Sequence, residues 1–373
     1  MVQPCPARVG DTYDDIVTPA LVVELDAYER NLQCMAGLVT GAGPRLRPHA
    51  KTHKSPEIAL EQIARGAVGA CCQKLSEAEV LAEGGVADIL IANQVVGAVK
   101  ATRLAALAGK VQLAVCVDHA DNVEELSRAA ATAGVELDLL VEIDVGNGRC
   151  GVLPGGPAVE LAKKVAAAKG LRFAGLQAYQ GAAQHIRGFA ERRAAVRSAA
   201  EMTMQTVVSL SGAKLDCEVV SGGGTGTLIH DLEAGVLTEM QAGSYVFMDA
   251  DYGRNLDQAG QPEVRFENAL FVLSTVMSHP RPERAVLDAG LKALAMDSGP
   301  PALKGVPGAR YADASDEHGT LALEREDLLG LGQRVLLIPG HCDPTVNLYD
   351  WYVGVRRGRV EKVWPVAARG ALA

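Results

Sequence analysis

The feature that most constrains the fold is a regular alternation of short apolar runs with longer helical segments between about residues 18 and 249. The runs are rich in β-branched residues, which favour buried strands, and the segments between them are rich in Ala, Leu and Glu, which favour helices. Repeated units of strand and helix predict a parallel sheet, because each helix returns the chain to the end of the sheet where the strand began. The predicted strands are residues 20–25, 46–50, 68–73, 89–93, 112–117, 137–143, 173–179 and 216–221.

Eight such strands with their connecting helices fit a (β/α)₈ barrel of the TIM type, and we expect this barrel over residues 18–250. An open, doubly wound sheet is the alternative, since periodicity alone does not distinguish a closed sheet from an open one. After about residue 251 the long helices stop, and we expect a mainly β C-terminal domain of residues 251–373, with residues 1–17 associated with it. Its predicted strands are residues 270–277, 284–287, 334–338, 351–355 and 360–365. The predicted fold class is α/β.

The composition argues against several classes of partner. The chain has 373 residues, and its 36 Lys+Arg against 45 Asp+Glu give a net charge of −9 with no long block of one sign. Such a chain has no block of positive charge that would attract nucleic acid or an anionic membrane. No apolar run reaches the roughly 20 residues that span a bilayer, and the first residues lack a signal pattern. We therefore expect a cytoplasmic protein without nucleic-acid or membrane partners.

Lys51 is the leading candidate for chemistry. In a barrel the reactive groups sit where strands end at the C-terminal mouth, and Lys51 follows the second predicted strand, between His49 and His53. In extended geometry all three side chains face the same way. Neighbouring cations and partial burial should lower the pKa of the lysine amine, as attack on an aldehyde near neutral pH requires. Lys54 is the rival lysine, but it would face the opposite side as a surface charge.

Polar and ionisable residues also follow three later strands of the predicted barrel. The run 221–227 after the last of them is rich in glycine, so its bare backbone N–H groups and hydroxyls could cradle a phosphate monoester. A glycine-rich loop alone is a weak signal, and this one fits neither the P-loop pattern nor the dinucleotide fingerprint. The candidates at these strand ends are Glu142, Asp144, Arg149, Tyr179, Gln180, His185, Ser221, Gly222, Gly223, Gly224 and Thr225.

A further candidate pair lies near the C-terminus. His341 and Asp343 are two residues apart, so in an extended loop an imidazole and a carboxylate project to one side. The pair would form half of a site for a divalent cation such as Mn²⁺, Mg²⁺ or Zn²⁺ and would leave room for water and substrate. Cys342 would point away as a packed thiol. The spacing alone leaves a metal site and a structural pair open.

Five motifs resemble, in this order, those of D-threonine aldolases and of the similar 3-hydroxy-D-aspartate aldolases, and they span nearly the whole chain. They are RPHAKTHK at residues 47–54, EIDVGNGRCG at 142–151, QAYQG at 177–181, QAGSY at 241–245 and GHCDPT at 340–345. The resemblance implies the alanine-racemase-type architecture of fold type III enzymes, in which a pyridoxal phosphate barrel precedes a β domain. It also implies a homodimer, which nothing in the sequence tests.

The resemblance assigns cofactor roles to candidates by position. It implies that Lys51 holds pyridoxal phosphate as a Schiff base, that Arg149 contacts the cofactor near its phenolic oxygen, and that Tyr179 lies against the pyridine ring. Residues 221–225 and Tyr245 would surround the phosphate and the ring.

The implied reaction is the cleavage of a D-3-hydroxy amino acid, a small-molecule substrate, to glycine and an aldehyde. His341 and Asp343 would ligate the divalent metal, which polarises the β-hydroxyl, and His185 or a water on the metal would remove the hydroxyl proton. The Cα–Cβ bond then breaks because the cofactor ring accepts its electrons.

Three other classes of protein share this type of barrel. D-serine dehydratases of the same fold use a His-x-Cys zinc pair, whereas the residue two after His341 is Asp343 here. A racemase would need a second acid or base on the opposite face of the cofactor and no metal. Small pyridoxal phosphate homeostasis proteins lack the second domain that residues 251–373 supply. These differences favour the aldolase.

The identity of the substrate side chain is left open by the sequence. A 3-hydroxyaspartate enzyme needs a cation for the second carboxylate, and Arg47, Arg254 and His318 are candidates by residue type. A D-threonine-type substrate is our first interpretation, and 3-hydroxy-D-aspartate, which gives glycine and glyoxylate, is the second.

Overall fold

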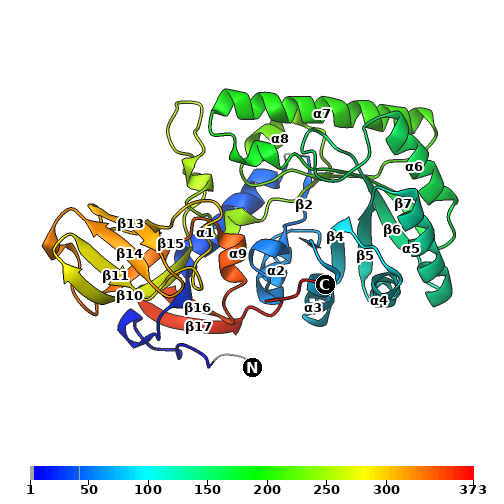
Figure 1. The fold of residues 1–373 in the computed structure, drawn as a ribbon. Helices are drawn as coiled ribbons and strands as arrows, with labels where there is room; N and C mark the ends of the chain where they lie inside the picture. The colour runs from blue at the N-terminus through cyan, green and yellow to red at the C-terminus, as the bar shows by residue number, and fades with distance from the viewer. Residues whose placement is uncertain (1–3, 42) are drawn as a thin grey trace.

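Eight parallel strands form one of two sheets in the computed structural model, which describes residues 4–41 and 43–373 (Figure 1). Hydrogen-bonded neighbours follow the order β2-β9-β8-β7-β6-β5-β4-β3. The two ends of this order meet, because His49 after β2 forms a parallel bridge to Cys71 of β3. The predicted (β/α)₈ barrel is confirmed, and the open sheet is excluded. The strands are β2 (Arg45–Leu46), β3 (Ala70–Cys72), β4 (Asp88–Gln94), β5 (Gln112–Val117), β6 (Leu137–Glu142), β7 (Leu171–Ala178), β8 (Val219–Gly222) and β9 (Glu239–Met240).

Helices alternate with the barrel strands and cover the outside of the barrel (Figure 1). Ser55 caps α2 by accepting a hydrogen bond from Ile58 N, and Pro56 occupies the first turn, where its missing N–H costs nothing. No helix in the described ranges is both long and apolar enough to cross a bilayer. The helices are α1 (Leu25–Val39), α2 (Pro56–Ile63), α3 (Leu75–Glu83), α4 (Ala98–Ala108), α5 (Ala120–Ala133), α6 (Gly156–Ala167), α7 (Phe189–Gly212) and α8 (Leu228–Ala234).

The second sheet has nine strands and forms the β-rich domain beside the barrel (Figure 1). Its main path is β13-β14-β11-β10-β1-β16-β17, and β15 pairs with both β10 and β12. These strands are β1 (Ala20–Glu24), β10 (Leu270–Arg281), β11 (Arg284–Leu287), β12 (Ala302–Leu303), β13 (Ala309–Ala314), β14 (Gly319–Leu323), β15 (Arg334–Ile338), β16 (Trp351–Arg356) and β17 (Arg359–Pro365). The short helices are η1 (Tyr13–Asp15), η2 (Ala50–Thr52), η3 (Ala182–His185), η4 (Ser244–Val246), η5 (Tyr252–Arg254), η6 (Glu326–Leu328) and α9 (Cys342–Val346).

The first predicted barrel strand belongs to the β-rich domain instead. β1 pairs antiparallel with β10 and parallel with β16, and four of its five residues are buried. The assignment of residues 20–25 to the barrel was therefore wrong, because an apolar run buried on both faces gives no sign of which sheet it will join. The eighth barrel strand is β9, whose two residues are too few to give a periodic signal. We keep residue 251 as the proposed start of the C-terminal domain and add β1 to that domain.

Hydrogen bonds fasten the β-rich domain to the C-terminal mouth of the barrel. Ala250 N donates to Pro339 O at 2.9 Å, and Ala368 N donates to Lys54 O at 2.9 Å. The Tyr352 hydroxyl donates to the backbone oxygen of His53 at 2.6 Å. These contacts place the loop that follows β15 directly above η2, where Lys51 lies.

Arg47 lies at the opposite, N-terminal mouth of the barrel. Its guanidinium contacts Asp88 at 2.7 Å and Glu239 at 2.8 Å, and Arg45 contacts Glu239 at 3.0 Å. The Glu239 side chain is almost fully buried, so these cations offset the cost of removing its charge from water. Arg47 cannot also bind a substrate carboxylate at the C-terminal mouth, and this candidate was wrong.

Replacing Arg47 should therefore change stability rather than substrate binding. Arg47→Met should lower the free energy of unfolding by about 3 kcal/mol, because Glu239 would stay buried with only Arg45 as a partner. Arg30→Met, which removes an exposed pair with Glu267, should cost less than about 1 kcal/mol. Chemical denaturation followed by circular dichroism measures both values. Equal losses in the two variants would contradict the structural role of Arg47.

Candidate active site

The candidate site is a cavity of about 120 Å³ at the C-terminal mouth of the barrel, below the loop that follows β15. Residues from several barrel strand ends and from the β-rich domain line it together. The resemblance assigned roles to twelve residues, and nine of them line the cavity: Lys51, Arg149, Tyr179, His185, Gly223, Gly224, Thr225, His341 and Asp343. The structure thus brings together residues that are almost 300 positions apart in the sequence.

Lys51 lies in η2 and extends into the cavity toward the β-rich domain. Its Nζ is 3.7 Å from Asp343 Oδ2. Burial is the largest single influence and lowers the pKa of this amine, but Asp343 and Tyr179 together with Cys71 outweigh it, so the pKa lies above its ordinary value. We predicted a lowered pKa, and that prediction was wrong. The flanking His49 and His53 are buried, burial lowers their pKa values, to about 4 for His53, and at neutral pH they add no positive charge.

Lys54 is excluded as the rival lysine. Its Nζ forms a 2.5 Å ion pair with Glu77, and both side chains are buried. The predicted surface role of Lys54 was wrong, because η2 turns the chain here and the extended alternation ends. The 3₁₀ turn leaves Lys51 as the lysine in the cavity.

The glycine-rich run after β8 forms one wall of the cavity. Gly223 has a φ of 73°, a conformation that glycine adopts without strain. A Cβ on Gly224 would lie 2.4 Å from Gln184 Oε1, so the backbone here packs closer than a side chain would allow. Tyr245 N donates to Thr225 Oγ1 at 3.0 Å and fixes the end of the run. This backbone surface suits a phosphate monoester.

Ser221, Gly222 and Tyr245 do not line the cavity. The buried Ser221 hydroxyl accepts a hydrogen bond from Gln241 Nε2 at 2.9 Å, and Gly222 packs against the backbone of β7. The Tyr245 hydroxyl accepts one from Gln62 Nε2 at 2.9 Å, on the side of α2. We therefore correct the predicted direct contact of these three residues with the cofactor. Their role in the structure is to support the wall from behind.

Arg149 and Tyr179 lie together on another side of the cavity. The Arg149 guanidinium carbon is 5.6 Å from the centre of the Tyr179 ring, which is a cation–π contact. Gln177 and Gln241 exchange amide hydrogen bonds of 3.1 and 2.7 Å below them. These two glutamines line the cavity and were not predicted as site residues, although both occur in the quoted motifs.

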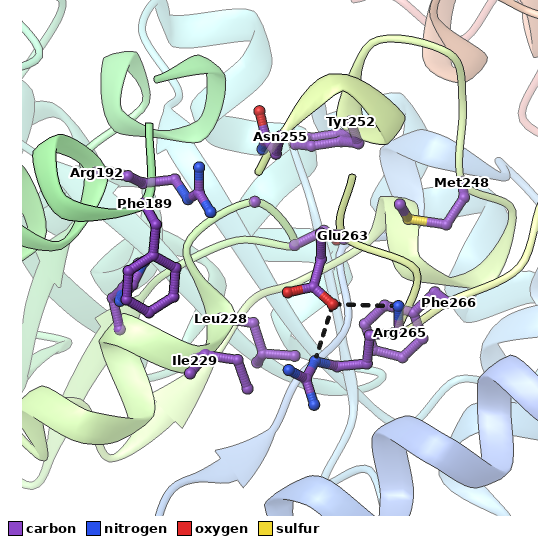
Figure 2. A pocket seen from close by; sticks show the side chains of 13 residues that line it. Phe189, Arg192, Leu228, Ile229, Met248, Tyr252, Asn255, Glu263, Arg265 and Phe266 are labelled. Atoms are coloured by element: carbon purple, nitrogen blue, oxygen red, sulfur yellow. Dashed lines mark hydrogen bonds and ion pairs between the residues drawn. The ribbon is translucent and has the colours of Figure 1, made fainter. Parts of the chain in front are cut away.

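Tyr252 was also missed, and no sequence signal marked it. It lines both this cavity and a smaller, mostly apolar pocket of about 30 Å³ (Figure 2). Its ring stacks on His185, with the ring centres 5.7 Å apart. His185 ends η3, and its Nδ1 is 2.6 Å from Asp251 Oδ2. The predicted base is therefore held on two sides at the edge of the cavity.

His341 and Asp343 are the residues predicted to bind a cation, and both line the cavity. His341 Nδ1 is 2.7 Å from Asp297 Oδ2, which leaves Nε2 as the nitrogen for a metal. Burial lowers the pKa of His341, but Asp343 and Asp297 outweigh burial and raise it. Asp343 Oδ1 is buried and has no hydrogen-bond partner among the described residues. Within the same residues no group of three or more His, Cys, Asp or Glu could hold a metal, so the pair fits a cation that takes its other ligands from water or substrate.

Two family models match the chain and define its class. The model described as alanine racemase, N-terminal domain, matches residues 23–251, and the model described as putative serine dehydratase domain matches residues 269–355. The first match covers more than half of the chain and coincides with the barrel. The fold and the site are those of an alanine-racemase-type enzyme, a family that implies pyridoxal phosphate as the cofactor.

Comparison with individual proteins narrows this class. The chain is 47% identical to 3-hydroxy-D-aspartate aldolase of Paracoccus denitrificans (strain Pd 1222), over 98% of this chain and 95% of that protein. It is 46% identical to D-threonine aldolase of an Arthrobacter species, over 98% and 96%. The crystal structure of D-threonine aldolase from Filomicrobium marinum matches with a TM-score of 0.96 and 50% identity, over 99% of this chain and 100% of that one. The chain belongs to the family of D-threonine aldolases and 3-hydroxy-D-aspartate aldolases, as its motifs predicted.

Replacing each lysine separately tests which of them holds the cofactor. Lys51→Ala should abolish the visible absorbance band of the lysine-bound cofactor, whereas Lys54→Met should keep it, because Lys54 is occupied by Glu77. Reduction with borohydride followed by peptide mapping should place the pyridoxyl group on Lys51 in the native protein. A label on Lys54 would overturn the assignment.

Proposed function

We propose that this protein cleaves D-3-hydroxy amino acids of the D-threonine type to glycine and an aldehyde, with pyridoxal phosphate and a divalent metal. The observation that carries the proposal is the 3.7 Å approach of Lys51 Nζ to Asp343 Oδ2. It brings the amine that would hold the cofactor next to one acid of the half-site that would hold the metal. A substrate joined to a cofactor on Lys51 would therefore lie within reach of that half-site.

The residues present fit the cofactor. The Lys51 amine can anchor its aldehyde, the backbone of residues 223–225 can accept its phosphate, and Arg149 and Tyr179 lie on a third side of the cavity. When bound, pyridoxal phosphate would supply the electron sink for the bond that breaks. The chain itself supplies the orientation, since every one of these residues is fixed by a strand end or a short turn.

His185 is positioned to take the proton of the β-hydroxyl. Its ring lines the cavity, and Asp251 occupies Nδ1, so Nε2 is the nitrogen available to the substrate. His341 and Asp343 would hold Mn²⁺ or Mg²⁺, or alternatively Zn²⁺, where it would polarise the same hydroxyl. In this proposal the metal held by His341 and Asp343 would polarise the hydroxyl, and His185 would remove its proton.

The alternative dehydratase function would need a thiol near His341 to bind zinc, and the neighbouring thiol is that of Cys342. Cys342 is fully buried, and its thiol donates to Met248 O at 3.3 Å, away from the cavity. Burial also raises the pKa of this thiol well above its ordinary value, whereas a zinc ligand has to be a thiolate. Asp343 would take the ligand position instead, which supports the proposed aldolase.

The second candidate substrate is 3-hydroxy-D-aspartate, the substrate in the name of the Paracoccus relative. Of the three predicted cations for its second carboxylate, Arg47 lies at the other mouth of the barrel, and His318 is exposed in the β13–β14 turn. Arg254 lies beside His185 through their shared partner Asp251. We retain Arg254 as the candidate to be tested. We also propose that the enzyme works in the cytoplasm as a homodimer, without nucleic-acid or membrane partners.

Comparing substrates in one assay tests the proposed reaction. D-threonine and D-phenylserine should each give glycine and the corresponding aldehyde, and D-3-hydroxyaspartate should give glyoxylate if Arg254 or another cation accepts its second carboxylate. Aldehyde-coupled reduction measures all three rates. Failure on all three substrates, with conversion of D-serine to pyruvate, would replace the aldolase with a dehydratase.

Removing the metal pair tests its part in the reaction. Asp343→Asn, or chelation of the wild-type enzyme, should reduce cleavage at least about 100-fold and leave the cofactor absorbance band in place. Asp327→Asn, at an exposed position of η6, is the matched control and should keep full activity. Full activity in chelator would remove the metal from the proposal.

A further inference from the structure

Asp251 is a buried carboxylate that accepts hydrogen bonds from three basic side chains. Its Oδ2 is 2.6 Å from His185 Nδ1, and its Oδ1 accepts hydrogen bonds from Arg187 at 2.5 Å and from Arg254. Burial alone would raise the pKa of this acid, but the bonds from Arg187, His185 and Arg254 outweigh burial and hold the pKa below its usual range. The carboxylate is therefore ionised at neutral pH.

An ionised carboxylate can only accept hydrogen bonds, so His185 Nδ1 must be the donor in this pair. In the neutral imidazole the other nitrogen, Nε2, then carries a lone pair and can accept a proton. The stacked ring of Tyr252 restrains the same imidazole from its face. The protein thus fixes both the tautomer and the plane of His185.

The segments that carry His185 and Asp251 are also tied to each other. Arg192 of α7 donates to the backbone oxygens of Ile186, Arg187 and Leu256. Asn255 accepts from Arg187 at 2.8 Å and donates to the backbone of η3 at 2.9 Å. Figure 2 shows Arg192 and Asn255 beside the apolar pocket that adjoins the candidate site. These bonds hold the distance between the imidazole and its carboxylate.

Arg254 extends the arrangement to the β-rich domain. The same nitrogen that binds Asp251 donates to Ser298 O at 2.8 Å. The preceding residue, Asp297, is the partner of His341. Arg254 therefore links Asp251, the partner of His185, to the segment that carries Asp297, the partner of His341.

We propose that Asp251 is a positioning residue that presents His185 Nε2 to the β-hydroxyl, and that Arg254 acts through Asp251 rather than on the substrate. The inference rests on the proposed function, because it assumes that His185 is the base. It assigns Arg254 a part in catalysis with every substrate, whereas a carboxylate-binding role would affect 3-hydroxyaspartate alone.

Asp251→Asn tests the positioning role in the holoenzyme. An amide can either donate or accept, so it no longer fixes the tautomer, and kcat for D-threonine should fall at least about 100-fold with KM changed less than about threefold. Binding of glycine, which has no β-hydroxyl, should give the same spectral change as in the wild type. Asp138→Asn is the matched control, since it breaks an Arg–Asp pair of similar geometry at the other barrel mouth and should keep kcat.

A spectroscopic measurement separates positioning from general damage. The ring ¹⁵N shifts of His185, assigned with His185→Gln, should show Nδ1 protonated in the wild type and a mixture of tautomers in Asp251→Asn. A wild-type ring protonated at Nε2, or full kcat in Asp251→Asn, would overturn the proposal. If the wild type cleaves none of the D-3-hydroxy substrates, the proposed function fails, and the ¹⁵N result still decides the tautomer.

Arg254→Gln provides a second test at an exposed position that should tolerate replacement. We expect kcat to fall by a similar factor, about 10-fold, with D-threonine and with D-3-hydroxyaspartate, because Arg187 still binds Asp251. A rise in KM confined to D-3-hydroxyaspartate, with kcat unchanged, would show that Arg254 binds the substrate carboxylate and would refute its assignment here.

Discussion

The active site depends on a few hydrogen bonds that hold residues 339–343 of the β-rich domain over the barrel mouth. Ala250 N donates to Pro339 O, Asp251 N donates to Gly340 O, and Cys342 N donates to a side-chain oxygen of Asp249. Each bond joins the end of the barrel sequence to the loop after β15. Because backbone groups make most of these contacts, side-chain variation changes them little. Together with the bonds from Ala368 and Tyr352 to the backbone after Lys51, they keep the lysine of one domain facing the acid of the other.

One arrangement of side chains occurs twice in the site. His185 and His341 both point Nδ1 at a carboxylate, from Asp251 and Asp297 respectively. A carboxylate at Nδ1 fixes the tautomer and the orientation of the ring, so that Nε2 is the nitrogen that faces a proton or a metal. The two acids differ in environment, since Asp251 is buried between arginines and Asp297 is half-exposed. The same contact therefore orients the histidine that we propose as the base and the histidine that we propose as the metal ligand.

The sequence was most informative where residues follow strand ends and least informative where the chain turns. Lys51 could be found because it lies between two histidines shortly after a β-strand. The predicted cause of its reactivity was wrong, because burial makes those histidines neutral. Tyr245 was predicted from the family resemblance and Tyr252 was missed, because η4 and η5 break the alternation that predicts where side chains point. Asp251 and Asp297 lie 66 and 44 positions from the histidines they contact, and no local pattern reports such pairs. The strand β9 was missed because two residues are too few to show an alternation of apolar and polar side chains.

The placement of β1 has a consequence for how the chain folds as it is made. Leu21 pairs with Val272 and with Tyr352, so β1 leaves the ribosome 272 − 21 = 251 residues before its first partner strand. At about 5–20 residues per second this interval lasts roughly 13–50 s. During that time the barrel sequence can emerge and close, while an apolar strand at its N-terminus stays without a sheet. The nascent chain therefore exposes an unpaired apolar strand. We expect synthesis rate and chaperone binding to affect the yield of folded protein more than they affect the stability of either finished domain.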